Sequence, residues 1–349
     1  MFNISHTYKG YWWLPSNPNE KVAGILEYIP NDSIRLEIFG DFYTDSNLST
    51  LKRILEGEKV SVIHGECSDA TKITLFNCFT SGSWNTSSFP LIQFSCSYVV
   101  LGKFLDNYDQ NSFFQATFFN PELNLWCPPK LIQSTYYTDD SNSNFKQLDI
   151  RITPDTTPIA EFKLEELTIK ILQSTSVVSN HLEPKISQCS KFEIHSNQDQ
   201  SIATFLHAIH IIEQFLSIAC LTQSQCTQIQ FYSKNDFEII SDQKKNFKSI
   251  EFLYIQDIKP QNIELIHFRP LIEFDYIKEK LNIISTTFLS NKDIAPIREH
   301  LVECIKNKRV FSSVDFLIII QAIEGFWWRF REASYREKHT NIKKIKRLR

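Results

Sequence analysis

The chain has 349 residues, of which 42% are hydrophobic and 13% aromatic, with 28 Phe, 8 Gly and 13 Pro. This composition excludes wholesale disorder, collagen-like chains and low-complexity proteins, and the length suits two or three domains with cores of their own. Residues 1–15 contain no apolar core of the length that an export signal needs. The apolar run Phe316–Ile320 is too short to span a membrane. We therefore predict a soluble cytoplasmic protein without membrane contact.

Strand signals begin within residues 10–40. The aromatic block Gly10–Pro15 leads into two runs, Val22–Tyr28 and Ile34–Phe39, and the second run places an apolar side chain at every other position. The adjacent residues Trp12 and Trp13 point to opposite sides of a strand, so at least one of them should pack in the core.

Similar short strands continue along the N-terminal region. They are Val60–Glu66, Lys72–Cys78 and Phe94–Gly102, with Ser-, Asn- and Asp-rich turns between the predicted strands. Strands of this length and spacing are typical of an antiparallel sandwich or jelly roll. We predict that residues 1–155 form an antiparallel, β-sandwich-like domain.

The order of the motifs in these segments carries a family resemblance. WWLP at 12–15, V-x-G-x-L at 22–26, I-x-G-E at 63–66, I-T-L-x-N-C at 73–78, Y-V-x-L-G at 98–102 and L-x-x-W at 123–126 resemble the N-terminal domain of ApeA-type proteins. The resemblance spans roughly residues 10–330. It implies a bacterial anti-phage abortive-infection protein, whose N-terminal region recognises a phage component and whose relatives carry a C-terminal HEPN ribonuclease domain. An unrelated antiparallel β-protein is the alternative.

Residues 156–270 form a predicted mixed α/β lobe of the same N-terminal region. A β segment at Ile159–Leu172 has Lys185–His195 as its predicted partner, and the first strong helix is Gln198–Leu221, capped by Ser196 or Asn197. Ile229–Tyr232 and Ile250–Ile255 are predicted as further short strands. The overall class is therefore α+β.

Residues 271–349 are predicted to be helical. One amphipathic helix presents Ile272, Tyr276, Ile277, Leu281, Ile284 and Phe288, and a second covers Ile294–Cys304. The third, Ser313–Tyr335, is apolar nearly all round and should be buried on several sides. Because so wide an apolar surface needs a partner, we expect a homo-oligomer or another pairing through this helix.

The third helix is similar to the first long helix of ApeA-type HEPN domains, through its Gln321–Glu324 stretch. HEPN ribonucleases use a later Arg-x(4–6)-His motif, in which arginine stabilises phosphorane charge and histidine moves a proton. This sequence has no such motif, because Arg336 lies too close to His339 and Arg331 too far from it. We expect that 271–349 is the start of an incomplete HEPN-like bundle, through truncation, frameshift or a split gene, and assign no catalytic residue.

A basic cluster lies at residues 329–349, where nine Lys or Arg stand against two Glu. Its principal members are Arg329, Arg331, Arg336, Lys343, Lys344, Lys346 and Arg347. Such a cluster on an otherwise acidic chain is typical of RNA or phosphate contact. The alternative is a solvated helix end, where cations are favoured by the helix dipole.

The eight cysteines indicate no metal or disulfide framework. They show neither a C-x-x-C pair nor zinc-finger spacing with histidine, so structural free thiols are expected. His207 and His210 lie three apart on the predicted helix but lack a third ligand at matching spacing. We expect neither a metal nor a cofactor.

The leading hypothesis is a sensor module of an abortive-infection protein, with a phage protein as trigger. Tyr and Trp dominate interface hot spots, so the candidate contact aromatics are Tyr11, Trp12, Trp13 and Trp84, with core packing as the competing role of Trp12 and Trp13. The alternative is a carbohydrate- or protein-binding β-sandwich with a helical oligomerisation tail. A third hypothesis, a hydrolase that uses Asp139, Asp140, His64, Glu66 and His195, has no supporting motif.

Overall fold

The structure is a computed structural model that describes residues 5–42, 59–85, 89–138, 145–152, 158–178, 185–241, 244–255, 270–306, 317–318 and 320–325. The chain forms two compact units assembled from interleaved segments. Unit 1 comprises Met1–Asn120, Lys191–His207 and Gln225–Glu264, and unit 2 comprises Pro121–Ser190, Ala208–Ser224 and Leu265–Arg349. The division at residues 155 and 270 concerns domain boundaries and stays a prediction.

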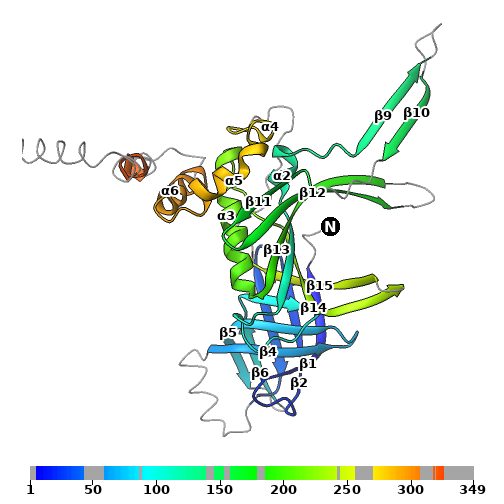
Figure 1. The fold of residues 1–349 in the computed structure, drawn as a ribbon. Coiled ribbons are helices and arrows are strands. Elements are labelled where there is room, and N and C mark those ends of the chain that lie inside the picture. The colour runs from blue at the N-terminus through cyan, green and yellow to red at the C-terminus, as the bar shows by residue number, and fades with distance from the viewer. Residues whose placement is uncertain are drawn as a thin grey trace, which may run out of the picture. The chain divides into compact units, whose positions relative to one another are not determined.

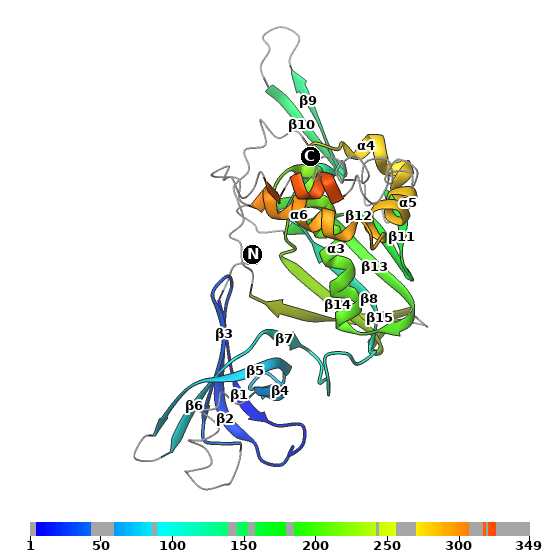
Figure 2. The same ribbon diagram turned by 90° about the vertical axis from the view of Figure 1, so that its left-hand side faces the viewer.

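Unit 1 contains a closed antiparallel barrel of six strands (Figures 1 and 2). The strands are β1 (His6–Trp13), β2 (Val22–Ile29), β3 (Ser33–Phe39), β4 (Lys59–Cys67), β5 (Lys72–Asn85) and β6 (Pro90–Ser95). They pair in the order β1-β2-β3-β6-β5-β4, and β4 pairs back to β1, which closes the ring. The predicted sandwich is therefore wrong in its architecture: the strands are antiparallel, but they form a barrel.

The barrel interior is filled by the inward side of each strand. Trp12, Leu36, Ile38, Ile63 and Leu75 are among its fully buried members. The alternation that the sequence shows in Ile34–Phe39 is thus the alternation between the interior and the outer wall of the barrel, because successive side chains of a strand point to opposite faces.

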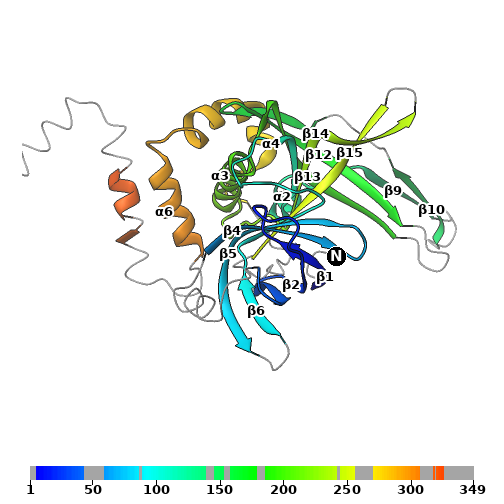
Figure 3. The same cartoon turned by 90° about the horizontal axis from the view of Figure 1, so that it is seen from below.

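The same sheet continues beyond the barrel because β5 pairs with two strands along one edge. Its Phe79–Asn85 half pairs with β6, whereas Ile73–Phe76 pairs with β7 (Tyr98–Leu101). From β7 the order continues through β15 (Lys244–Tyr254), β14 (Gln228–Ser241), β8 (Phe113–Phe119) and β13 (Lys185–Gln200). Figure 3 shows β13, β14 and β15 from below.

Aromatic rings pack on one face of this extension of the sheet within unit 1. Phe118 stacks on Phe192 with centroids 4.8 Å apart, and Phe231 contacts Phe113 at 5.0 Å. Phe205, from the first turns of helix α3 (Ile202–Cys220), lies 5.8 Å from Phe231. The hydroxyl of Ser201 accepts a hydrogen bond from the Thr204 amide and so caps α3. The predicted caps Ser196 and Asn197 lie in β13 instead.

Unit 2 combines a β-hairpin with most of the helices. The hairpin is β11 (Ala160–Leu164) and β12 (Leu167–Val178), and β13 follows β12 in the sheet order, as the sequence predicts. The helices are α2 (Pro121–Trp126), the Ala208–Cys220 part of α3, α4 (Phe274–Ile277), α5 (Leu281–Ile284) and α6 (Ala295–Lys306). A separate two-stranded ribbon joins β9 (Ile132–Thr138) to β10 (Phe145–Ile152).

The segment predicted as one amphipathic helix, Ile272–Phe288, is broken. A 3₁₀ turn at Lys278–Lys280 follows α4, and a π-helical turn at Ser285–Leu289 follows α5. Both change the number of residues per turn, so the buried positions become Phe274, Leu281, Ser285 and Leu289, while Tyr276 is 76% exposed. The prediction that Tyr276 faces the core is wrong.

Helix α3 is long and apolar enough to match the dimensions of a membrane span, but most of it is buried within the protein. Such burial is what the core helix of a soluble protein shows. Of the predicted helix Ser313–Tyr335, residues 317–318 and 320–325 are described and helical, and the remainder lies outside the described residues.

Candidate functional site

Trp12 and Trp13 lie on opposite sides of the barrel wall, and both are buried. Trp12 fills the interior, whereas the ring of Trp13 packs edge-on against Phe104 at 5.4 Å and lies 4.4 Å below the Lys21 ammonium. The expectation that at least one of them packs in the core is confirmed. Their burial makes both side chains unavailable for direct contact with a partner.

Tyr11 and Trp84, by contrast, are exposed on the outer wall of the barrel, at 58% and 52%. Residues paired across neighbouring strands share a face. Tyr11 pairs with Ala23 of β2, Phe39 of β3 pairs with Leu91 of β6, and Leu91 pairs with Trp84 of β5. Because Ala23 and Phe39 flank the paired residues Gly24 and Ile38, one row of the outer wall runs from Tyr11 to Trp84.

Two further phenylalanines make this row a continuous aromatic surface. Phe39 lies within the row, and Phe89 packs edge-on against it with ring centroids 6.1 Å apart. The Trp84 indole lies over Gly82, where an added Cβ would come within 2.8 Å of its ring. We call Tyr11, Phe39, Phe89 and Trp84 the aromatic row.

A groove of about 600 Å³ lies at the Tyr11 end of the aromatic row. Its lining includes Tyr11, Ala23, Ile25 and Phe39, with Lys9 and Glu66 as its charged members. Charges of both signs therefore stand beside an apolar floor. This arrangement suits an apolar group with polar surroundings and does not favour a polyanion.

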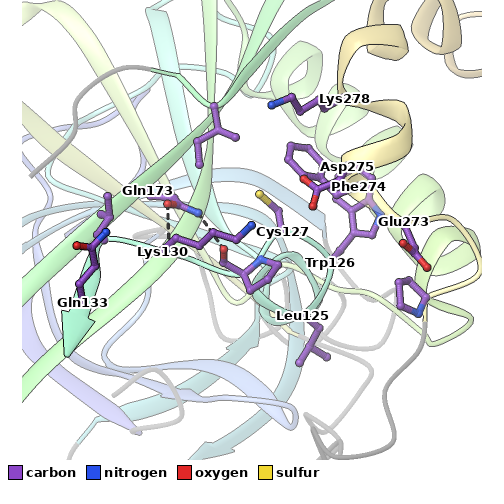
Figure 4. Close-up of a pocket in the computed structure, with 14 residues that line it drawn as sticks. Leu125, Trp126, Cys127, Lys130, Gln133, Gln173, Glu273, Phe274, Asp275 and Lys278 are labelled. Carbon is purple, nitrogen blue, oxygen red and sulfur yellow. Dashed lines mark hydrogen bonds between the residues drawn. The ribbon is translucent and has the colours of Figure 1, made fainter. Parts of the chain in front are cut away.

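Unit 2 contains a second cavity, also of about 600 Å³, between the chain after α2 and the chain around α4 (Figure 4). Its inner wall is formed by Trp126, Cys127 and Phe274. The Trp126 indole N–H donates to the Ile272 carbonyl at 2.7 Å, and its ring meets Phe274 edge-on at 4.9 Å. The sequence signals this tryptophan as part of L-x-x-W but gives no sign of the cavity.

Four charged side chains line the second cavity: Lys130, Glu273, Asp275 and Lys278. Three of them act on the buried Cys127 thiol, where Asp275 raises its pKa and the two lysines lower it. Burial is the largest cause, and it raises the pKa of Cys127 to about 11. The thiol is therefore protonated and unreactive near neutral pH.

The other predicted side chains are dispersed. His64 is buried and its Nε2 lies 3.0 Å from the Leu105 carbonyl oxygen, whereas His195 Nε2 lies 2.6 Å from the Glu193 carboxylate. His207 and His210 are exposed on α3. Asp139, Asp140 and the basic cluster at 329–349 lie outside the described residues.

All eight cysteines are free thiols, as expected. Within the part of the chain that the structure describes, no three His, Cys, Asp or Glu side chains are grouped to hold a metal ion.

The comparison with protein families covers most of the chain. Residues 7–287 match the model of ApeA N-terminal domain 1. No curated protein and no solved structure matches the chain significantly. Since the matched segment exceeds half of the sequence, the chain belongs to the ApeA N-terminal domain 1 family and hence to the abortive-infection defence proteins.

Proposed function

We propose that this chain is the sensor module of its defence protein and that the aromatic row binds a phage protein. The observation that carries this proposal is the exposure of four aromatic side chains along one side of a closed barrel. Large aromatic side chains on a rigid wall provide contact area at little cost in conformational entropy, which is why they dominate interface hot spots.

The surroundings of the aromatic row support a protein as the partner. Ala23, Ile25 and Leu91 extend the apolar surface between the rings. Arg35 and Glu37 alternate in sign along β3, so the wall has no charge preference that would suit RNA or DNA. An apolar centre with a mixed polar rim is the usual anatomy of a protein–protein interface.

A photo-crosslinker tests this proposal in living cells. With Trp84→p-benzoylphenylalanine, we expect a covalent adduct that forms only after phage infection and whose mass spectrum identifies a phage-encoded protein. Tyr11→Ala should reduce adduct yield about tenfold, since hot-spot truncations cost over 1.4 kcal/mol. Tyr276→Ala removes an exposed tyrosine far from the barrel in sequence and should leave the yield unchanged. An adduct that is absent, or that forms equally without infection, would contradict the proposal.

A glycan is the second candidate ligand, because exposed Tyr and Trp rings also stack on sugars. Binding of immobilised glycans that depends on Tyr11 and Trp84 would favour this alternative. The photo-crosslinking experiment separates the two hypotheses, because a glycan ligand gives no adduct with a phage-encoded protein.

Three further features of the function are proposals as well. We place the protein in the cytoplasm and infer that full-length relatives cleave RNA through a HEPN domain whose Arg-x(4–6)-His motif this sequence lacks. RNA contact through the basic cluster at 329–349 is tested by the salt dependence of binding to a short RNA, which should weaken steeply as salt rises. Weak binding that is independent of salt would contradict it.

Pairing through the Ser313–Tyr335 helix is supported by Ile323, which is 61% exposed, and by the exposed Ile320 and Leu317, about one and two turns before it. Light scattering should detect an oligomer, and Ile323→Glu should convert it to a monomer. A wild-type monomer would overturn this proposal.

A further inference from the structure

We infer that the cavity of unit 2 that Trp126, Cys127 and Phe274 line binds a small hydroxylated anion, with a phosphate or carboxylate group held between Lys130 and Lys278. The inference is independent of the aromatic row, which lies on the barrel. Three observations carry it: the walls are held by hydrogen bonds, the charged groups do not pair across the cavity, and both signs of charge are present in its lining.

The walls are held by side-chain hydrogen bonds to backbone groups. Gln173 accepts from the Lys130 amide at 3.2 Å and donates to the Pro128 carbonyl at 3.1 Å. Ser190 donates to the Cys127 carbonyl at 2.6 Å. The segment that carries Lys130 is thereby fixed before any ligand arrives, and a pre-formed cavity of several hundred Å³ is the usual form of a small-molecule site.

The charged groups around the cavity are not satisfied by one another. Among the described residues, neither Lys130 nor Asp275 forms an ion pair, and the ion pair of Lys278 joins it to its sequence neighbour Glu279 at 3.9 Å. Figure 4 shows Lys130 reaching toward Cys127, with Lys278 and Asp275 on the other side of the space. Charges of opposite sign that face a cavity without pairing leave their hydrogen-bonding capacity to a ligand.

The two signs of charge in the lining define a ligand with two kinds of polar group. Lys130 and Lys278 contribute two positive charges to the lining of the cavity, and Glu273 and Asp275 contribute two negative charges. An anionic group is favoured between the two lysines, because each lysine ammonium supplies up to three donors to phosphate or carboxylate oxygens. Asp275 has only acceptors when ionised, so it complements a hydroxyl group of the same ligand.

The test uses the whole chain and three probes of similar size. Ribose 5-phosphate carries the phosphate, gluconate the carboxylate, and ribose neither. We expect at least one of the two anions to raise the melting temperature and to bind in calorimetry, because a ligand that binds only the folded state stabilises it. Ribose should do neither, and comparison of the two anions identifies the headgroup.

Variants locate the site. Lys130→Gln and Lys278→Gln should each weaken binding by about tenfold, the effect of losing one charge-assisted hydrogen bond. Lys280 belongs to the same 3₁₀ turn as Lys278 but does not line the cavity, so Lys280→Gln makes the same change of charge and should have no effect. Asp275→Asn should lower the preference for ribose 5-phosphate over inorganic phosphate. The inference fails if neither anion binds, if ribose binds equally well, or if Lys280→Gln weakens binding as much as Lys130→Gln.

Discussion

Gly65 and Trp12 face each other across the β1–β4 pair and leave no room for a larger residue. A Cβ at position 65 would lie 2.3 Å from the six-membered ring of the Trp12 indole. Trp12 is fully buried, so the ring has no free space into which it can move. The V-x-G-x-L and I-x-G-E motifs thus contain glycines for a packing reason, since Gly24 also contacts this indole.

We predict that Gly65→Ala lowers the free energy of unfolding by roughly 1–3 kcal/mol, the usual cost of overpacking a core. Trp12→Phe replaces the two-ring indole by a single smaller ring and so removes the atoms that the new Cβ would meet. In this background the additional cost of Gly65→Ala should therefore be smaller. Urea denaturation of the four proteins of this double-mutant cycle measures the difference. Additive effects of the two substitutions would show that Gly65 and Trp12 do not interact in this way.

Tyr8 packs partly buried against the barrel core and gives the fold a pH dependence at alkaline pH. Burial, with a smaller contribution from Glu251, raises the pKa of Tyr8 from 10.0 to about 12. The folded state therefore holds this proton more tightly than the unfolded state, so the stabilisation is complete below pH 10 and is lost between pH 10 and about 12.

Tyr8→Phe should accordingly reduce the fall in melting temperature between pH 10 and 12, because phenylalanine has no proton to lose. Tyr11→Phe, on the exposed wall of the same strand, serves as the control and should follow the parent protein. Identical pH profiles for Tyr8→Phe and the parent would refute the assignment. Melting curves at half-unit pH intervals are sufficient to separate these results.

At the scale of the element, β11 is an edge strand, and another segment of the chain covers its outer edge. Its Lys163 amide donates to the Asn282 side chain at 3.0 Å, and its Lys163 carbonyl accepts a hydrogen bond from Ser285. The side chains of α5 and the π-helical turn thus occupy the positions of a neighbouring strand. An uncovered edge would invite pairing with another chain.

We predict that Asn282→Ala and Ser285→Ala each lower the free energy of unfolding by about 1 kcal/mol, the net value of one hydrogen bond. Hydrogen exchange of the Lys163 amide should accelerate in Asn282→Ala. Thr286→Ala, which removes a hydroxyl bonded only within its own helix, is the matched control. Unchanged exchange at Lys163 would mean that Asn282 does not protect the edge.

The elements differ in how far sequence predicts them. The sequence predicts one β segment over Ile159–Leu172, and its apolar residues Phe162, Leu164 and Ile169 are buried as expected. The structure divides this segment into the β11–β12 hairpin, with the turn between Leu164 and Leu167, where the apolar alternation changes phase. A uniform helical period does not predict which residues of Ile272–Phe288 face the core. The reason is that the 3₁₀ and π turns between 278 and 289 depend on tertiary contacts, such as that of Ser285 with β11.

At the scale of the molecule, local patterns predict antiparallel strands but not their closure. Whether six short strands form a sandwich or a barrel depends on the pairings β1–β4 and β3–β6, which involve residues distant along the chain. The candidate sites follow the same rule. Exposure of Trp84 is expected from its Ser-rich surroundings, whereas its place in one row with Phe39 requires the register, and the cavity at Cys127 requires segments that are far apart in sequence.

Two elements belong to both compact units and should couple their unfolding. Strand β13 passes from unit 2 to unit 1 at Lys191, and α3 passes from unit 1 to unit 2 at Ala208. Unfolding of either unit disrupts a strand and a helix that continue into the other unit. Elements that share hydrogen-bonded structure in this way tend to open as one cooperative unit.

We therefore predict a single unfolding transition in urea, with the same midpoint for probes in both units. Phe205→Ala, at the unit 1 end of α3, should lower the free energy of unfolding by about 3–5 kcal/mol. Hydrogen exchange measured by mass spectrometry should then show equal destabilisation of peptides from the barrel and from β11. The Leu221→Ala control removes an exposed side chain just beyond α3 and should leave both peptides unchanged. Destabilisation confined to unit 1 would show that β13 and α3 transmit no coupling and that the two units are independent folding domains.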